Sequence, residues 1–546
     1  MMKRLLLPLV AASVMASGCV MVSGGSKDAH KNEVKKEQPA DAKSGTVTPA
    51  AVAETPAATP AAAAATDDVK TNRTALVAKL DQIFTKDPRF ANAHWGVMVK
   101  SLKTGETWYE HDSNKLFNPA SNEKIPTSST ALTVLGPDFR YITTVDGNGE
   151  IKDGTLKGDL VVFGQGDPSM YAYKEPALKF QWWQDSRDVF RTWAKQLKEK
   201  GVTHITGNIV GDDNAWSDQH TGQGWPPPDD IAAWYYAEYG ALQFNENYVD
   251  IKITPPAAPG GEVKLEPNVP SKYFTLVNKI GTDPNGSTSV NLNRDTGSNT
   301  ITLTGNVKPG AAVLTETASI TNPTLWFVTV LKETLQAEGI TVDGEPKDCD
   351  DIAGWDHKPT DFPTLITHSS PPLSEIMTLL VKRSQNMYAE TMVYTQGWKK
   401  TGKGSFESGQ KSVAEELKKM GVESTDYEYA DGSGLSRYDY ISPAAIIKIE
   451  TFMRNSPNWQ TWYDMQSIAG VDGTLKRRMK GTKAEGNVHG KTGTISNVRA
   501  LSGYVKTAAG EELVFSFLVN GHTRTSAETD SITDAAAVAL ADYEGN

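Results

Sequence analysis

Apolar residues recur along the chain with both strand and helix periods, which predicts a mixture of strands and helices. A strand hairpin is predicted around the Lys-Thr-Gly turn at residues 103–105, and a helix that begins near Ser121 follows it. Beyond residue 365, long segments with helical spacing precede a pair of strands and a last helix. This order of elements predicts an α/β (α+β) fold.

The middle of the chain contains an amphipathic helix that occurs twice. Each copy ends in a glycine and is followed by a short strand. The matching positions are Phe190, Trp193, Leu197 and Gly201 in the first copy and Val328, Leu331, Leu335 and Gly339 in the second. Two similar units so far apart predict one domain that is interrupted by another. Short alternating segments with turn residues lie between them, which predicts a small insert made mostly of strands.

The start of the chain is typical of a secretory signal peptide, with basic residues, an apolar stretch and small residues at the end. Ala16-Ser17-Gly18-Cys19 resembles a bacterial lipoprotein cleavage site, after which Cys19 would carry the lipid, although a large aliphatic residue is more usual in place of Ala16. The alternative is ordinary signal cleavage, with Cys19 removed or left as a free thiol. No later apolar run is long enough to span a bilayer.

Composition narrows the remaining possibilities. Residues 19–70 are rich in Ala and Pro and contain no aromatic residue, so they are predicted to form a disordered tether. The net charge of −11 argues against nucleic acid as the main partner. Cys349 has no Cys or His neighbours at metal-ligand spacing, so no structural zinc site is expected. If Cys19 is acylated, no disulfide can form within the chain.

The segment Gly490-Lys491-Thr492 matches the end of a phosphate-binding loop, but the glycine that should stand at 485 stands at 486. The surroundings also argue against such a loop, because a basic, polar segment precedes it and two strands are predicted to follow it. Lys491 is therefore predicted to lie on a strand. Neither a nucleotide nor any other cofactor is expected.

Three short motifs occur in order along the chain: Ser121-Asn122-Glu123-Lys124, Ser384-Gln385-Asn386 and Lys491-Thr492-Gly493. Each is weak alone, and a second Ser-x-x-Lys, from Ser408 to Lys411, occurs in a polar segment. The first motif has the better context, because Lys124 follows Ser121 by one turn on the same face of a predicted helix. A hydroxyl beside an amine is a nucleophile–base arrangement. For Ser121 alone, the alternative is a helix N-cap.

The three motifs, in this order, resemble those of penicillin-binding proteins and serine β-lactamases. The stretch between Lys124 and Ser384 is far longer than a single-domain β-lactamase needs. Segments such as GDLVVFGQGDPSM, GNIVGDDNAW and DGSGLSRYDYISP make residues 75–540 similar to the D-alanyl-D-alanine carboxypeptidase/endopeptidase family, the class C low-molecular-mass penicillin-binding proteins. The resemblance implies a penicillin-binding/β-lactamase-like catalytic domain split by two nested inserted domains, the inner one mostly β.

The patterns and the resemblance together divide the chain into parts. The predicted boundaries are 1–18 for the signal peptide, 19–70 for the tether, 71–158 with 365–546 for the catalytic domain, 159–250 with 321–364 for the inserted domain, and 251–320 for the nested β domain.

The resemblance implies an acyl-transfer reaction on peptidoglycan stem peptides that end in D-Ala-D-Ala, or on similar cross-links. Ser121 would attack the peptide carbonyl and form an acyl-enzyme, and Lys124 would take the proton of its hydroxyl. Ser384 would relay a proton between the lysines and the leaving amine. Lys124 must be partly neutral for this, so repulsion from Lys491, together with burial, is expected to lower its pKa.

The resemblance also implies how the substrate is held. Asn386 would bind the substrate amide and position Lys124, and the backbone N–H groups of Ser121 and Thr494 would form an oxyanion hole. Gly493 would leave room for the peptide along the strand. The residues expected to bind the terminal carboxylate are Lys491, Thr492 and Thr494. The Gly-rich segment 431–436 is either part of the site or a structural turn.

Two residues depart from the family's pattern. Gln385 stands where Asp is usual, and little effect is expected, because that side chain carries no assigned chemistry. Pro126 falls early in the helix of Ser121, where it removes an N–H and bears on the geometry of Ser121 and Lys124.

Three alternatives remain beside this interpretation. A class A β-lactamase needs a Glu-x-x-Leu-Asn loop between the second and third motifs, and none occurs between 386 and 491. A catalytically idle scaffold that binds the cell wall would have no need of the intact motif residues. A Ser-His-Asp hydrolase has no Gly-x-Ser-x-Gly to support it.

The resulting expectation is an exported enzyme of the cell envelope or periplasm, anchored to a membrane by a lipid on Cys19. Its expected partners are D-Ala-D-Ala peptides of peptidoglycan and β-lactam antibiotics, which would acylate Ser121 as covalent inhibitors. The sequence leaves the balance between carboxypeptidase and endopeptidase open, because both cut the same kind of bond.

Overall fold

The computed structural model describes residues 73–172, 180–225 and 231–545. The predicted signal peptide, the tether and Cys19 lie outside these residues. Among the described residues, no helix is both long and apolar enough to cross a membrane.

A six-stranded antiparallel sheet joins the two ends of the folded chain, in the order β18-β19-β20-β21-β1-β2. The predicted hairpin is confirmed, because β1 and β2 pair on either side of Gly105. The two strands predicted after Lys491 are also present and pair with each other. The strands are β1 (His94–Ser101), β2 (Thr107–His111), β18 (Ser467–Ile468), β19 (His489–Ile495), β20 (Val498–Lys506) and β21 (Glu512–Asn520).

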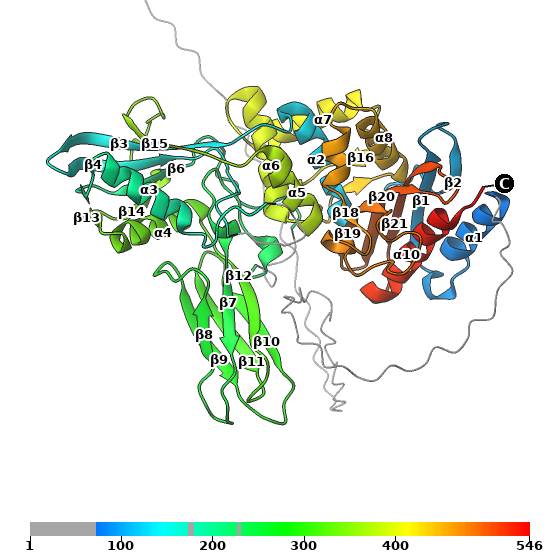
Figure 1. Ribbon diagram of the computed structural model, residues 1–546, viewed down its shortest axis with the longest axis horizontal. Helices are drawn as coiled ribbons and strands as arrows, with labels where there is room; N and C mark the ends of the chain where they lie inside the picture. The colour runs from blue at the N-terminus through cyan, green and yellow to red at the C-terminus, as the bar shows by residue number, and fades with distance from the viewer. Residues whose placement is uncertain (1–72, 173–179, 226–230, 546) are drawn as a thin grey trace, which may run out of the picture. The chain divides into compact units, whose positions relative to one another are not determined.

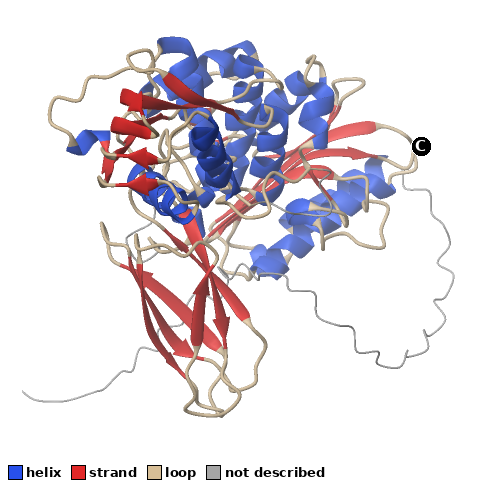
Figure 2. Cartoon of the chain, turned by 60° about the vertical axis from the view of Figure 1, so that its left-hand side comes forward, coloured by secondary structure: helices blue, strands red, loops and turns tan. Residues whose placement is uncertain are grey.

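Helices cover both faces of this sheet (Figures 1 and 2). On one face, α1 (Arg73–Thr85) and α10 (Ser526–Asp542) pack against apolar side chains such as Phe515 and Phe517 of β21. The neighbouring positions of the same strand, Val514 and Leu518, face the other core. This alternation follows from the two-residue period of a strand, and it lets one sheet support a core on each side.

The second core is built around α2 (Lys124–Leu135), in which every residue from Lys124 to Leu132 is buried. The helices α5, α6, α7 and α8 contact α2. Because α2 is buried on all sides here, its position is set by the helices packed around it. The helices of this region are α5 (Leu373–Arg383), α6 (Asn386–Thr401), α7 (Phe406–Lys419), α8 (Pro443–Arg454) and α9 (Trp459–Asp464), and a small pair of strands, β16 (Tyr427–Glu428) and β17 (Tyr440–Ile441), lies between α7 and α8 in the chain.

Both copies of the repeated unit contribute strands to one seven-stranded sheet. The helices of the two copies, α3 (Asp188–Glu199) and α4 (Pro323–Ala337), contact each other. The strands that follow them pair in parallel, β5 with β13 and β6 with β14. The strands of this sheet are β3 (Ile142–Lys152), β4 (Thr155–Phe163), β5 (His204–Ile205), β6 (Ile209–Asp212), β13 (Thr341–Val342), β14 (Pro346–Asp348) and β15 (Thr364–Ser369). The repeat in the sequence thus corresponds to two adjacent structural units.

Two three-stranded sheets occupy the chain between the repeated units. One contains β7 (Tyr248–Thr254), β8 (Lys264–Pro267) and β12 (Leu314–Ser319), and the other contains β9 (Thr275–Gly281), β10 (Ser289–Arg294) and β11 (Thr300–Asn306). All their pairs are antiparallel except β9 with β11. The alternating segments therefore form strands as predicted. The domain boundaries remain a prediction, and the one at 158 falls within β4.

A buried carboxyl group links α8 to the sheet. Glu450 is fully buried and accepts hydrogen bonds from the indole of Trp462, at 2.8 Å, and from the hydroxyl of Tyr504. Burial raises the pKa of Glu450 to about 7, because an ionised carboxylate loses its hydration there.

We predict that Glu450→Gln makes stability less dependent on pH. A carboxyl whose folded pKa is raised stabilises the fold fully below its unfolded pKa of 4.5, and this contribution is lost as the pH rises through about 7. The loss for Glu450 is on the order of 3 kcal/mol, and glutamine cannot ionise. Thermal melting at about pH 5 and about pH 8 measures the effect. Equal shifts of melting temperature in the wild type and the variant would contradict it.

Candidate active site

Ser121 lies in a short 3-10 turn, η2 (Ala120–Glu123), and α2 begins at Lys124. The predicted helix therefore starts with a tighter turn, but the side chains still meet, since the Lys124 amine donates to the Ser121 hydroxyl at 3.1 Å. Pro126 lies in the first turn of α2, where the missing N–H costs little, so it leaves this geometry intact.

The amine of Lys124 is fully buried and has three acceptors. Besides the Ser121 hydroxyl, it donates to the side-chain oxygen of Asn386 at 2.7 Å and to the backbone carbonyl of Ser433 at 2.6 Å. A flexible lysine side chain is thereby held in one position beside the hydroxyl. Burial lowers the pKa of Lys124 to about 8, although nearby carboxyl groups, Asp431 foremost, oppose this shift.

The origin of this low pKa differs from the expectation. Burial is the largest cause at Lys124, whereas the repulsion between the two lysines lowers the pKa of Lys491 instead. Burial also acts first on Lys491, and the pKa of that amine falls well below its ordinary value. Lys124 can therefore exchange a proton near neutral pH, and the Lys491 amine loses its proton more readily than an ordinary lysine.

Four buried carboxyl groups surround Lys124: Glu123, Glu390, Asp431 and Asp439. Burial raises the pKa of Glu390 to about 8 and the pKa of Glu123 well above its ordinary value. Both oxygens of Glu123 lack a hydrogen-bond partner within the described part of the chain. Neutral carboxyl groups here avoid a cluster of unpaired negative charges.

Asp431 shapes the Gly-rich turn at 431–436. Its carboxylate accepts from the backbone N–H groups of Ser433, Gly434 and Ser436 at 2.6–2.9 Å. Within this turn, the backbone carbonyl of Ser433 accepts a hydrogen bond from Lys124. The sequence left open whether segment 431–436 is part of the site or a structural turn. The structure shows that it contacts the site directly.

Ser384 forms the junction between α5 and α6 and adopts a left-handed conformation, with φ 59°. Its hydroxyl accepts a hydrogen bond from the Lys491 amine at 2.8 Å, and this amine also donates to the carbonyl of Thr492 at 2.7 Å. The second and third motifs thus form one hydroxyl–amine pair, beside the pair of the first motif.

The strand β19 brings the third motif to the site. Lys491 lies on it as predicted, the Thr492 hydroxyl donates to that of Thr474 at 2.8 Å, and Thr494 is exposed further along. A β-carbon on Gly493 would lie 2.5 Å from the carbonyl oxygen of Pro119. Gly493 therefore allows β19 to approach the Ser121 turn, a role different from the expected space for a substrate.

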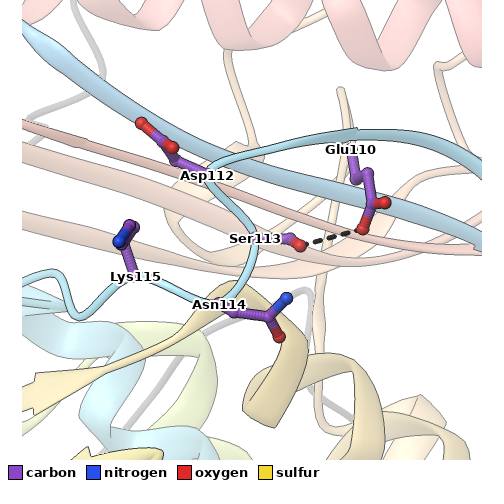
Figure 3. A pocket seen from close by; sticks show the side chains of 5 residues that line it. All are labelled: Glu110, Asp112, Ser113, Asn114 and Lys115. Atoms are coloured by element: carbon purple, nitrogen blue, oxygen red, sulfur yellow. Dashed lines mark hydrogen bonds between the residues drawn. The ribbon is translucent and has the colours of Figure 1, made fainter.

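The remaining sequence-predicted positions fall elsewhere. Cys19 lies outside the described residues. Ser408, in the second Ser-x-x-Lys, forms a reciprocal pair of hydrogen bonds with Ser405, the N-cap of α7, which is a structural role. A hollow of about 290 Å³, lined by Glu110, Asp112, Ser113, Asn114 and Lys115, contains no motif residue (Figure 3). Its side chains come from one segment at the end of β2, and Ser113 donates to Glu110 at 2.9 Å.

The sequence did not identify several residues that touch this site. Glu123 lies within the first motif and Asp431 begins the Gly-rich segment 431–436, so their positions carried a signal. Thr474 had no such signal, because a single hydroxyl leaves no pattern in a sequence. Ser433 lies in the Gly-rich segment, but nothing there indicated that its backbone carbonyl contacts Lys124.

The geometry suits acyl transfer. A serine hydroxyl lies beside an amine of lowered pKa, and a second serine–lysine pair stands ready to move a proton. The crystal structure of penicillin-binding protein 4 (dacB) from Haemophilus influenzae has the same fold, with a TM-score of 0.70, 23% identity and coverage of 84% of this chain and 97% of that chain. Fold and site together define a serine enzyme of the penicillin-binding class.

The comparison with protein families is more specific. The D-Ala-D-Ala carboxypeptidase 3 (S13) family matches residues 76–543. A D-alanyl-D-alanine carboxypeptidase of an Actinomadura species is 33% identical over 479 residues, which cover 84% of each chain. D-alanyl-D-alanine carboxypeptidase DacB of Haemophilus influenzae is 24% identical over 442 residues, covering 80% of this chain and 87% of the relative. The chain belongs to the D-Ala-D-Ala carboxypeptidase 3 (S13) family of serine hydrolases.

We predict that Gly493→Ala slows acylation by a fluorescent penicillin about tenfold or more. The new methyl group meets the Pro119 carbonyl, so β19 or the Ser121 turn must shift, and overpacking of this kind costs about 1–3 kcal/mol. The matched control is Gly240→Ala, whose β-carbon would lie 3.7 Å from its nearest neighbours. An acylation rate unchanged in Gly493→Ala would show that the close approach is not needed.

Proposed function

We propose that this enzyme cleaves D-Ala-D-Ala bonds in peptidoglycan stem peptides through an acyl-enzyme on Ser121, as a carboxypeptidase, an endopeptidase or both. The observation that carries the proposal is the 3.1 Å hydrogen bond from the buried Lys124 amine to the Ser121 hydroxyl. The names of the relatives agree with it, since both are D-alanyl-D-alanine carboxypeptidases.

The first step is attack of the Ser121 hydroxyl on the peptide carbonyl. Lys124 takes the hydroxyl proton, and with a pKa of about 8 roughly one molecule in ten holds it neutral at pH 7. The Ser384 hydroxyl, bonded to the Lys491 amine, relays a proton from the lysines to the leaving nitrogen as the peptide bond breaks, and so keeps its own proton overall. Water then attacks the ester and releases the shortened peptide, which restores the Ser121 hydroxyl.

Substrate binding follows from the edge of β19. The short strand β18 pairs only with His489 and Gly490, so an extended peptide has access to the strand beyond them. Lys491, Thr492 and Thr494 would bind the terminal carboxylate, and the backbone N–H groups of Ser121 and Thr494 would stabilise the oxyanion. Asn386 would hold the substrate amide while it supports Lys124.

A β-lactam would react by the same route. Its ring resembles the D-Ala-D-Ala amide, and the amine freed by ring opening stays attached to the acyl group. The solved structure of penicillin-binding protein 4 from Haemophilus influenzae includes a complex with a β-lactam. The Glu-x-x-Leu-Asn loop with which class A β-lactamases deacylate is missing between 386 and 491. A long-lived adduct therefore fits this chain better than turnover.

The proposal extends to location. The signal-like start, the Cys19 context and the Ala- and Pro-rich tether support an exported lipoprotein of the cell envelope or periplasm. A tether of this length spans roughly 40 Å as a flexible coil, so the folded part could act at a distance from its membrane.

We predict that a fluorescent penicillin labels the peptide that contains Ser121, and that the label survives for minutes or longer. The same protein should release D-alanine from a peptide that ends in D-Ala-D-Ala. Ser121→Ala should abolish both reactions, because it removes the nucleophile, whereas Lys491→Ala should slow labelling without moving the label. Peptide mapping of the labelled protein locates the adduct.

Ser408→Ala is the matched control for this experiment, and it should label like the wild type. No label on well-folded wild-type protein would favour an idle scaffold. Turnover of penicillin at something like ~10–1000 per second would favour a β-lactamase.

We predict that Cys19→Ala releases the protein from membranes. A lipid on Cys19 is the anchor that the sequence indicates for the chain after signal cleavage, and that chain has no apolar run long enough to span a bilayer. Detergent phase separation of cell extracts measures the change, with the wild type expected in the detergent phase. Wild-type protein in the aqueous phase would contradict the lipid anchor.

A further inference from the structure

Ser384 lies where the backbone is strained, so contacts from outside its own helices can support it. Ser384 ends α5 in a left-handed conformation and Gln385 precedes α6, so two helices meet at one strained residue. This conformation favours glycine or asparagine, and serine adopts it at a cost. A small rotation here would move the Ser384 hydroxyl away from the Lys491 amine.

That support comes from a carboxylate in a distant segment. Glu246 lies just before β7, in the segment between the two repeated units, and is buried. It stands within three consecutive left-handed residues, Asn245, Glu246 and Asn247, with φ of 52°, 52° and 54°. The side chain of Asn245 donates to the carbonyl of Tyr248 at 2.6 Å, and that of Asn247 accepts from the N–H of Phe244 at 3.1 Å, which fixes this turn.

Glu246 binds the residues on both sides of Ser384. One carboxylate oxygen pairs with the Arg383 guanidinium at 2.9 Å, and the other accepts from the Gln385 amide at 2.9 Å and from the Tyr248 hydroxyl. Arg383 also donates to the Tyr248 hydroxyl at 3.3 Å. Each oxygen of the carboxylate thus holds one neighbour of Ser384.

The same region of the chain also reaches the third residue of the motif. The Asn386 amide donates to the carbonyl of Tyr235 at 2.9 Å, while its oxygen accepts from Lys124. Arg383 and the two motif residues after Ser384, Gln385 and Asn386, are therefore all bound from residues 235–248.

We propose that Glu246 is a positioning residue. It binds Arg383 and Gln385 and so keeps the Ser384 hydroxyl within hydrogen-bond distance of the Lys491 amine. The proposal rests on the acyl-enzyme chemistry proposed above. Glu246 does not touch the reacting atoms; it acts through the backbone of the Ser384 turn.

The unusual Gln385 fits this arrangement. The aspartate that the family usually carries at this place would face the Glu246 carboxylate with a like charge. The Gln385 amide instead donates a proton to it. Glu246 and Gln385 are thus a matched acceptor and donor, and the departure that seemed neutral in the sequence has a structural reason.

The test compares Glu246→Gln, Gln385→Glu and the double variant that carries both. The acylation rate constant and the affinity of the complex before acylation are measured separately, by rapid mixing with a chromogenic β-lactam. Each single variant should lower the rate constant about 10- to 100-fold, since misplacement of a catalytic group by about 1 Å has effects of this size. The affinity should change little, because the residues proposed to bind the carboxylate of the ligand lie on β19.

The double variant gives the sharpest readout. It exchanges acceptor and donor, so an amide at position 246 can again bond to a carboxylate at position 385, and the rate constant should recover at least about tenfold over Gln385→Glu. Loss of folded protein would reduce the amount of enzyme that reacts and leave the rate constant of the rest unchanged. Glu450→Gln is the control for replacing a buried glutamate, and its rate constant should equal the wild type's.

Normal rate constants in both single variants, or a double variant no faster than the slower single one, would overturn the positioning role. Wild-type protein that forms no adduct would instead overturn the acyl-enzyme proposal itself, so the two failures are distinguishable.

Discussion

The burial of one lysine amine is the constraint on which the rest of this structure depends. Lys124 can act as a base only if its pKa is low, and burial beside Ser121 lowers it to about 8. A buried amine without partners would cost several kcal/mol, so acceptors must be built around it. The oxygens of Asn386 and Ser433 meet this need, and they come from α6 and from the Gly-rich turn.

Those two acceptors explain much of the packing around α2. The helix α6 must lie against α2 for Asn386 to reach the amine, and the Gly-rich turn must stay closed, which the Asp431 carboxylate ensures by binding three backbone N–H groups. The cost is a group of buried carboxyl groups around the amine, and burial raises the pKa of Glu390 to about 8 and the pKa of Glu123 well above its ordinary value. Two opposing effects thus set the pKa of Lys124. Burial lowers it, and the carboxyl groups around the amine raise it.

The central part of the chain has a place in this arrangement. Residues 235–248 hold each neighbour of Ser384, so the segment that interrupts the catalytic motifs also supports one of them. Ser384 lies between α5 and α6 in a left-handed conformation that is costly for serine, so contacts from outside these helices help to stabilise it. Residues 235–248 and the Ser384 turn are therefore joined by direct contacts at this point.

The sequence by itself determined the elements and the chemistry that have local signals. The hairpin, the strands after Lys491, the repeated helix–strand unit and the three motifs each depend on spacing within a few residues, and the order of the motifs indicated the family. The tertiary structure decided what depends on contacts between distant residues. It showed that burial sets the pKa of Lys124, that Gly493 makes room for Pro119, and that Glu246 grips the Ser384 turn. Such contacts join positions that lie far apart in the sequence, where no periodicity or motif records them, so only the folded chain brings them together.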